Sequence, residues 1–154
     1  MKILMVCLGN ICRSPLAEGI MREKIKQHGL DWEVDSAGTG SWHVGNEPDH
    51  RSIAVGLDNG IDIRSQRGRQ ISKEDLDIYD LIFVMDSSNY QNVQRLVFRK
   101  EQKDKIEMIM NLVQPGYNQS VPDPYYGDDG FVDVYEMLDT ACDHLVKKYS
   151  DSER

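Results

Sequence analysis

Short apolar runs alternate with longer segments of helical periodicity along this chain. Residues 2–6 and 81–85 are almost continuously hydrophobic, and residues 32–36 alternate between apolar and polar side chains, so all three are predicted to be strands. Residues 106–110 predict a weaker fourth strand. Elsewhere apolar side chains recur every three or four positions, which predicts helices. These side chains are Ala17, Ile20, Met21 and Ile25; Ile53 and Leu57; Val93, Leu96 and Val97; and Val134, Leu138, Ala141 and Leu145.

Strands that alternate with helices, roughly four of each, predict an α/β fold. The expected architecture is a three-layer sandwich, with a four-stranded parallel sheet between helices on both faces. Ser14 is expected to cap the first helix, with Pro15 as its first residue, and Ser87 or Ser88 to cap the helix after residue 85. Ligands of such sheets bind where the strands end, so Cys7, the loop after Ser36, and Asp86 should lie along one edge.

Composition narrows the class of protein. With 154 residues and 40% hydrophobic content, the chain is predicted to form one domain over residues 1–149, with a frayed tail at 150–154. A formal net charge of −8 argues against nucleic acid or an anionic membrane as a partner. Three cysteines favour a reducing compartment, and no apolar run reads as a signal peptide or membrane helix. We expect a cytoplasmic protein, and export without a signal stays open.

The segment that follows the first strand carries the candidate chemistry. It reads Cys7-Leu8-Gly9-Asn10-Ile11-Cys12-Arg13-Ser14-Pro15, a Cys-x5-Arg pattern between a strand and a helix N-terminus. Backbone N–H groups in such a loop form an anion cradle, and the same positive field favours a reactive thiolate. Arg13 could grip two phosphate oxygens at once. Cys-x5-Arg alone is a loose pattern, but its setting favours a nucleophile that accepts phosphate over a simple buried cysteine.

Taken with distant strings, this loop closely resembles the low-molecular-weight protein tyrosine phosphatases. The matching strings are the loop itself, Asp35-Ser36-Ala37-Gly38-Thr39, Arg69-Gln70-Ile71, Met85-Asp86-Ser87-Ser88-Asn89 and Asp123-Pro124-Tyr125-Tyr126. The resemblance runs from Lys2 to about Tyr149. It implies a flavodoxin-like sheet of strand order 2-1-3-4. It also implies a phosphatase that acts on phosphotyrosine proteins, binds phosphate in its loop, and is a monomer or associates weakly.

The resemblance also implies roles for three residues. Cys7 would attack phosphorus, Arg13 would clamp the phosphate oxygens, and Asp123 would act as general acid and then as general base. Asp123 on its sequence alone could equally be a turn residue between two prolines. The phosphate would be bound by the backbone of Leu8, Gly9, Asn10, Ile11, Cys12 and Arg13. No cofactor is expected, and the four histidines, His28, His43, His50 and His144, show no metal-ligand spacing.

The resemblance also implies which residues support the loop, and this chain differs from the family at one of them. Asn10, Ser14 and Ser36 match family residues that join a histidine in a polar network. The position of that histidine is occupied here by Gln66, which can donate and accept hydrogen bonds but does not titrate. Asn10 is also expected to tolerate a left-handed backbone.

Aromatic and cysteine residues near the loop carry further expectations. By the resemblance, Trp42, Tyr125 and Tyr126 would wall the substrate pocket, although one of the tyrosines could be ordinary packing. Cys12 is either a small buried loop residue or the partner of Cys7 in a reversible disulfide, and the resemblance favours the redox role. Cys142 falls on the apolar stripe of the last helix and should be core.

Three rival functions stay in view. Arsenate reduction on this scaffold needs further cysteines near the third strand, where this chain has Met85 and no cysteine between Cys12 and Cys142. Protein arginine phosphatases of the same family tend to carry Thr at the position of Ile11, so Ile11 favours phosphotyrosine. A silent phosphoprotein-binding module or redox sensor would keep Arg13 and the cradle but could lose Cys7 or Asp123, and both are present.

Overall fold

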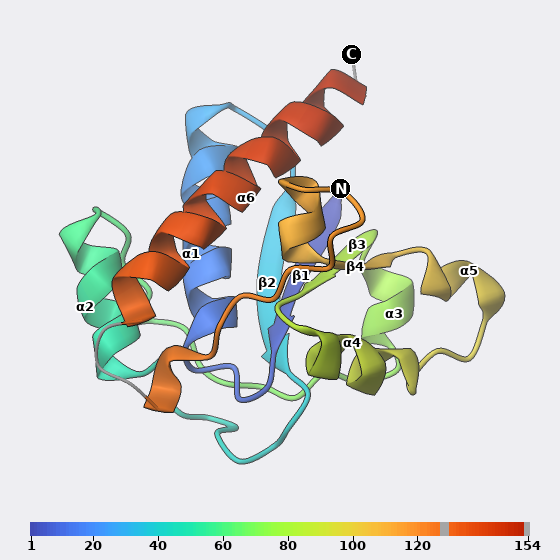
Figure 1. Cartoon of the computed structure of the whole chain (residues 1–154), viewed down its shortest axis with the longest axis horizontal. Helices are drawn as coiled ribbons and strands as arrows, with labels where there is room; N and C mark the ends of the chain where they lie inside the picture. The colour runs from blue at the N-terminus through green and yellow to red at the C-terminus, as the bar shows by residue number, and fades with distance from the viewer. Residues whose placement is uncertain (127–129, 153–154) are drawn as a thin grey trace.

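A four-stranded parallel sheet forms the middle layer of the protein (Figure 1). The computed structural model describes residues 1–126 and 130–152. Its sheet has the order β2-β1-β3-β4, which confirms the expected 2-1-3-4 arrangement. The strands are β1 (Lys2–Cys7), β2 (Glu33–Gly38), β3 (Leu81–Val84) and β4 (Ile106–Met108). All three pairings are parallel, with Cys7 opposite Gly38 and Val6 opposite Val84, so the strands end at one edge.

Helices cover both faces of this sheet, as the α/β pattern predicts. On one face α1 (Arg13–Gln27) packs against the long α6 (Gly130–Ser152), with α2 (His50–Asp58) beside them (Figure 1). The other face carries α3 (Asp75–Ile78) and α4 (Ser87–Gln94). Shorter turns complete the chain, namely α5 (Lys100–Lys103) and the 3-10 turns η1 (Ile109–Leu112) and η2 (Pro124–Tyr126).

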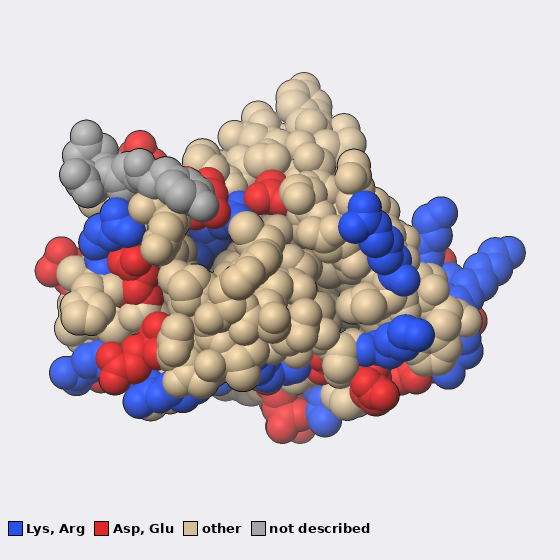
Figure 2. Space-filling view, turned by 90° about the horizontal axis from the view of Figure 1, so that it is seen from below, with Lys and Arg blue, Asp and Glu red and all other residues tan. Residues whose placement is uncertain are grey.

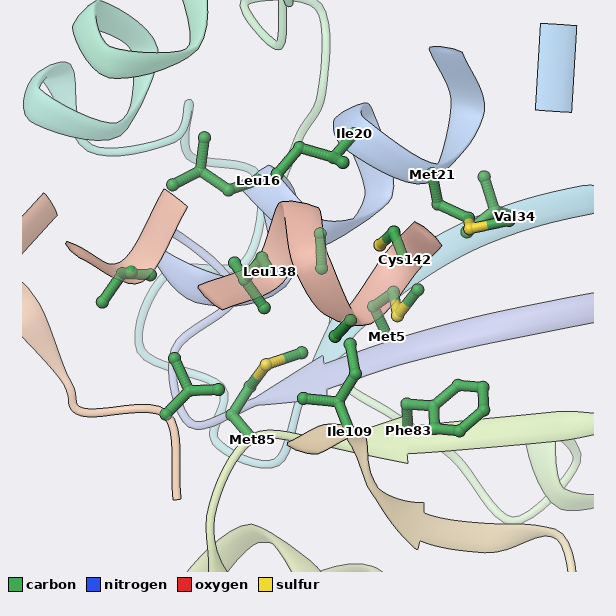
Figure 3. Packing of buried hydrophobic residues seen from close by; sticks show 14 of the residues in the cluster. Met5, Leu16, Ile20, Met21, Val34, Phe83, Met85, Ile109, Leu138 and Cys142 are labelled. Atoms are coloured by element: carbon green, nitrogen blue, oxygen red, sulfur yellow. The ribbon is translucent and has the colours of Figure 1, made fainter. Parts of the chain in front are cut away.

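Alternating side chains of β1 divide the hydrophobic core into two clusters. Ile3, Met5 and Cys7 face the larger cluster beneath α1 and α6, whereas Leu4 and Val6 face the smaller cluster beneath α3 and α4. Figure 3 shows side chains of α1 and α6 meeting those of the sheet in the larger cluster. Because each fully buried Leu, Ile or Met contributes roughly 1.5–3 kcal/mol, the two clusters hold the strand in a single register.

Several element ends differ from those expected, and one short helix was not predicted. The fourth strand ends at Met108, because the chain turns into η1 where residues 109 and 110 were expected to extend it. The charged segment 99–105 contains the short helix α5, whose buried Gln102 accepts hydrogen bonds from the N–H groups of Phe98 and Arg99. α6 runs through Ser152, so residues 150–152 of the expected frayed tail are helical, and residues 153–154 lie outside the described residues.

Candidate active site

The loop between β1 and α1 forms a cradle around the sulfur of Cys7. Cys7 is buried at the end of β1, and the N–H of Asn10 points to its Sγ at 3.3 Å. Asn10 has φ of 58°, the left-handed conformation expected for it. α1 begins at Arg13 with no side-chain cap, so the N–H groups of its first turn are available to an anion. The loop therefore has the geometry of an oxyanion site with a thiol at its base.

Ser14 does not cap α1, contrary to expectation. The helix starts two residues earlier, at Arg13, with Cys12 at the N-cap position. The Ser14 hydroxyl instead lies 3.0 Å from the Cys7 sulfur and accepts a hydrogen bond from Asn10 Nδ2 at 2.8 Å. Because the Ser14 hydroxyl bonds within the loop, it does not cap α1, and the backbone N–H groups at the start of that helix remain available to a ligand.

Asn10 connects the loop to the neighbouring strand. Its Nδ2 also donates to the Ser36 hydroxyl at 3.0 Å, and its Oδ1 accepts from the backbone N–H of Arg69 at 3.0 Å. The structure thus brings together Asn10, Ser14 and Ser36, all of them buried. With both ends of its amide bonded, Asn10 holds the left-handed turn that aims the loop amides inward.

Gln66 does not join this network. Its Nε2 donates to the Pro15 carbonyl at 3.1 Å, and its buried Oε1 finds no hydrogen-bond partner among the residues that the structure describes. The Ser36 hydroxyl donates instead to Glu18 Oε1 at 2.7 Å, and Glu18 pairs with Arg22 at 2.7 Å. Gln66 therefore occupies the position of the family histidine without a hydrogen bond to Asn10, Ser14 or Ser36.

Glu18 is a member of the network that the sequence interpretation missed. It is 4% exposed, and burial raises the pKa of its carboxyl while the hydrogen bond from Ser36 and the Arg22 guanidinium partly oppose that rise. No local pattern marks Glu18, because polar Ser14 and Arg22 share its helix face and its partner Ser36 lies on β2. The carboxyl fixes the orientation of the Ser36 hydroxyl, which leaves its lone pairs for Asn10.

Arg13 is held rigidly beside Cys7. Its Nη1 donates to Asp86 Oδ2 at 2.7 Å and to the Val121 carbonyl at 2.9 Å, and the side chain is 3% exposed. Asp86 also caps α4, since its Oδ1 accepts the N–H of Asn89 at 2.8 Å. Asp86, and not Ser87 or Ser88, is therefore the cap of α4. A buried guanidinium with one side paired is prepared to present its remaining donors to an anion.

Asp123 approaches the same place from the far end of the chain. The Val121 N–H donates to the Met85 carbonyl at 2.8 Å, which ties the segment 121–126 to the end of β3. Asp123 Oδ2 then lies 3.7 Å from Arg13 Nη2, and its side chain is 31% exposed. Asp123 Oδ1 accepts the N–H of Tyr125 at 3.1 Å. A carboxylate thus stands at the mouth of the cradle, where it can reach a leaving group.

These residues enclose a cavity of about 290 Å³. Its floor is formed by loop residues, and its walls come from Trp42, His43, Asp123 and Tyr125. Trp42 is 71% exposed and Tyr125 is 42% exposed, so both rings are available to a ligand. His43, which the sequence interpretation did not select, bonds Asn46 through its Nδ1 at 3.2 Å. The floor residues are Cys7, Leu8, Gly9, Ile11, Cys12 and Arg13.

Tyr126, also expected in the wall, has its side chain outside the described part of the structure. Figure 2 views the molecule from the edge where the strands end. Uncharged residues occupy the middle of this face, and acidic and basic side chains lie mostly toward its margins (Figure 2).

The other two cysteines differ in their surroundings. Burial raises the pKa of Cys12 to about 12, with further increases from Asp49 and Cys7. Cys142 is fully buried in the larger cluster, as expected for a core residue (Figure 3). Neither forms a disulfide.

No group of three or more His, Cys, Asp or Glu side chains is placed to hold a metal ion within residues 1–126 and 130–152. In the same ranges, no helix is long and apolar enough to cross a membrane.

Known proteins share both the sequence and the fold of this chain. Residues 2–153 match the family model described as low molecular weight phosphotyrosine protein phosphatase. The phosphatase of that name from Schizosaccharomyces pombe is 44% identical over 150 residues, which cover 95% of each chain. A protein tyrosine phosphatase from Entamoeba histolytica, with Hepes in its active site, superposes with a TM-score of 0.92 at 38% identity, covering 100% of this chain and 99% of that one.

The neighbours include a second activity. The structure of an arginine phosphatase from Drosophila superposes with a TM-score of 0.90 at 34% identity, over 97% of this chain and 98% of that one. The family match nevertheless spans nearly the whole chain, including every residue of the cradle. The chain belongs to the low molecular weight phosphotyrosine protein phosphatases and is a phosphoric monoester hydrolase.

Proposed function

We propose that this enzyme hydrolyses phosphotyrosine in proteins through a phosphate ester of the Cys7 sulfur. The observation that carries the proposal is the convergence of three groups on one cavity. Cys7 lies at its floor, the Arg13 guanidinium lies beside it, and Asp123 stands at its mouth. A nucleophile, a cation for the transferring group and an acid for the leaving group are the components that such a transfer requires.

In the first step the Cys7 sulfur attacks phosphorus opposite the phenolic oxygen. An S–P bond forms and the P–O bond to the tyrosine breaks, while Asp123 gives its proton to the leaving oxygen. Because a tyrosine phenol has a pKa of about 10, its anion is a poor leaving group at neutral pH and protonation lowers the barrier. Arg13 and the amides of the loop neutralise charge on the equatorial oxygens.

In the second step water attacks the phosphorus of the cysteinyl phosphate. Asp123, now ionised, takes a proton from that water, and the S–P bond breaks to release inorganic phosphate and restore Cys7. The hydroxyl of Ser14, 3.0 Å from Sγ, is positioned to donate to the departing sulfur. No cofactor or metal takes part in either step as proposed.

The difference in exposure between the sulfur and the aromatic rings supports phosphotyrosine over shorter phosphorylated side chains. Cys7 is buried, whereas Trp42 and Tyr125 in the lining of the same cavity are exposed, so we expect the short side chain of phosphoserine not to bring its phosphorus to the sulfur. The two rings can contact the faces of a phenyl group. Ile11 on the floor adds apolar surface that a guanidinium would have to contact.

Three phosphorylated peptides of one sequence test this substrate class. We expect the phosphotyrosine peptide to be hydrolysed with a kcat/KM at least about 100-fold above those of the phosphoserine and phosphoarginine peptides, because the cavity rejects them by size or charge. Release of inorganic phosphate is the measurement. A phosphoarginine peptide that equals or exceeds phosphotyrosine would assign the protein to the arginine phosphatase activity.

We also propose Cys12 as the redox partner of Cys7. Peroxide would oxidise the Cys7 sulfur to a sulfenic acid, and the Cys12 thiol would then form the S–S bond with loss of water. Both side chains are buried in one loop, five residues apart, which supports their meeting. A dithiol reductant would return both residues to thiols.

Recovery after oxidation measures this protection. After brief peroxide treatment and reduction, the wild type should regain most of its activity, whereas Cys12→Ser should regain much less because its Cys7 proceeds to irreversible acids. Each variant is compared with its own untreated activity. Equal recovery of the two proteins would show that Cys12 does not protect Cys7.

The setting of the enzyme is part of the proposal. The formal charge of −8 supports phosphoproteins in preference to nucleic acid or membrane surfaces as partners. Three free cysteines support a cytoplasmic location. We propose a monomer, or a weakly self-associating chain, that needs no partner to complete its site.

A further inference from the structure

Arg51, on the first turn of α2, contacts the segment that carries Asp123. Its Nη2 donates to the carbonyl oxygen of Tyr125 at 3.0 Å. Its guanidinium carbon also lies 4.6 Å from the centre of the Phe131 ring and 5.7 Å from the centre of the Tyr125 ring. Arg51 is far from Asp123 in sequence and outside the residues that line the cavity. Through Tyr125, Arg51 contacts the segment that supports the proposed acid.

Asp49 fixes the Arg51 side chain in this position. The carboxylate accepts the backbone N–H of Arg51 at 2.9 Å, Nε at 3.0 Å and Nη2 at 3.1 Å. Burial raises the pKa of Asp49, but the hydrogen bonds from Arg51 outweigh that and hold the pKa below its usual value. The carboxylate therefore stays charged, and the pair is a bidentate clamp whose geometry is set by two parallel bonds.

The same aspartate is tied to the phosphate cradle. The backbone N–H of Asp49 donates to the Ile11 carbonyl at 2.8 Å. A continuous path therefore runs from the cradle at Ile11, through Asp49 and Arg51, to the backbone of Tyr125. Asp123 is held from both directions, because Val121, two residues before it, is bonded to Met85 and Arg13, and Tyr125, two residues after it, is bonded to Arg51.

We propose that Arg51 is a positioning residue for the general acid, holding Asp123 at the distance from the cradle that proton transfer requires. The inference rests on the proposed function of Asp123. The guanidinium is suited to the task because it can bond a carboxylate, donate to a carbonyl and stack on a ring at once. A lysine at this position retains the charge, but its ammonium group cannot form the bidentate pair with the carboxylate and stack on a ring at the same time.

The dependence of the hydrolysis rate on the leaving group distinguishes a displaced general acid from a general loss of activity. An enzyme that protonates its leaving group should hydrolyse phenyl phosphate and p-nitrophenyl phosphate at similar rates, whereas one with a displaced acid should lose more on phenyl phosphate, whose phenol is the weaker acid. We expect Arg51→Lys and Arg51→Gln to lower kcat for phenyl phosphate by about 10-fold or more, while the loss for p-nitrophenyl phosphate is several-fold smaller.

Asp123→Asn provides the reference for a lost acid. This variant should show the same preference for the better leaving group, with a loss on phenyl phosphate of about 100-fold or more. Adding Arg51→Gln to Asp123→Asn should then change the ratio of the two rates by less than about twofold, since residues that act through one group are not additive.

Arg64 is a matched control. It forms the same two-residue clamp with Asp62, with Nε at 3.0 Å and Nη2 at 2.8 Å from the carboxylate, but on an exposed part of the chain outside the residues that line the cavity. Arg64→Gln should leave both rates unchanged. Rates are compared at a temperature well below the unfolding midpoint of every variant, so that loss of folded protein does not enter.

Hydrogen exchange supplies a readout that does not depend on turnover. In Arg51→Lys, the amides of Asp123 and Tyr125 should exchange faster than in wild type, and in Arg64→Gln they should not. Equal losses on the two aryl phosphates together with unchanged exchange would overturn the inference. A wild type that hydrolyses neither substrate would refute the proposed function, and the exchange result would still show whether Arg51 holds the segment.

Discussion

Replacing Cys7 by serine is expected to lower kcat for aryl phosphates by more than about 10⁴-fold, because the serine hydroxyl is a far weaker nucleophile in the same position. The substitution changes one buried atom and leaves Asn10, Ser14 and the loop backbone in place. The variant should therefore still bind inorganic phosphate, and the loss should fall on kcat. Steady-state rates with p-nitrophenyl phosphate and calorimetric titration with phosphate measure the two quantities.

Cys142→Ala is the control for this substitution. Cys142 is fully buried in the larger cluster, away from the cavity, so its loss should cost about 1 kcal/mol of stability and leave kcat unchanged. If Cys7→Ser kept more than a hundredth of the wild-type rate, the covalent mechanism would be wrong and water would have to attack the substrate directly.

Arg13→Lys should lower kcat by about 10³-fold or more, the range in which a transition-state arginine contributes to phosphoryl transfer. The lysine ammonium keeps the charge but loses the planar fork. It can satisfy Asp86 or follow the phosphate, but not both with the geometry of Arg13. Since ground-state phosphate contacts are lost as well, KM should rise.

Lysine is preferred to alanine at this position for a structural reason. Removing the guanidinium would leave Asp86 and Asp123, both now close to it, without a buried cation, and that alone is destabilising. Arg95→Lys, on an exposed arginine that bonds Asn92, should leave kcat and KM unchanged. An Arg13→Lys enzyme with wild-type kcat would show that charge alone suffices and that the fork has no role.

Local patterns in the sequence predicted most of the fold. Parallel strands such as 81–85 are buried on both faces, so their hydrophobic runs are legible without any partner. Residues 106–110 give a weaker strand pattern and only three of them pair in the sheet, because the chain turns into η1, which packs against α6. The predicted cap of α1 was wrong because the Ser14 hydroxyl accepts a hydrogen bond from Asn10 within the loop and does not cap the helix.

Residues of the site were predictable where the motif is local and less so where the contact is distant. Arg13 follows from its spacing to Cys7, but its partner Asp86 and the carbonyl of Val121 are brought to it only by the order of the strands. Glu18 was missed because a lone glutamate on a helix gives no sign that Ser36, on another strand, will bond it. Gln66 was placed at the position of the family histidine by comparing short sequence strings. Such a comparison does not show which way a side chain points or what it bonds.

The alternation of side chains along β1 limits which insertions and deletions the strand can accept. Cys7 continues the row of Ile3 and Met5, so the proposed nucleophile points toward α1 because it is the last side chain of a core row. Insertion or deletion of a single residue within β1 would turn the sulfur toward α3 and α4, on the wrong side of the sheet, while a change of two residues would restore its direction. Within the strand, changes of length that keep the direction of the Cys7 sulfur are therefore restricted to even steps.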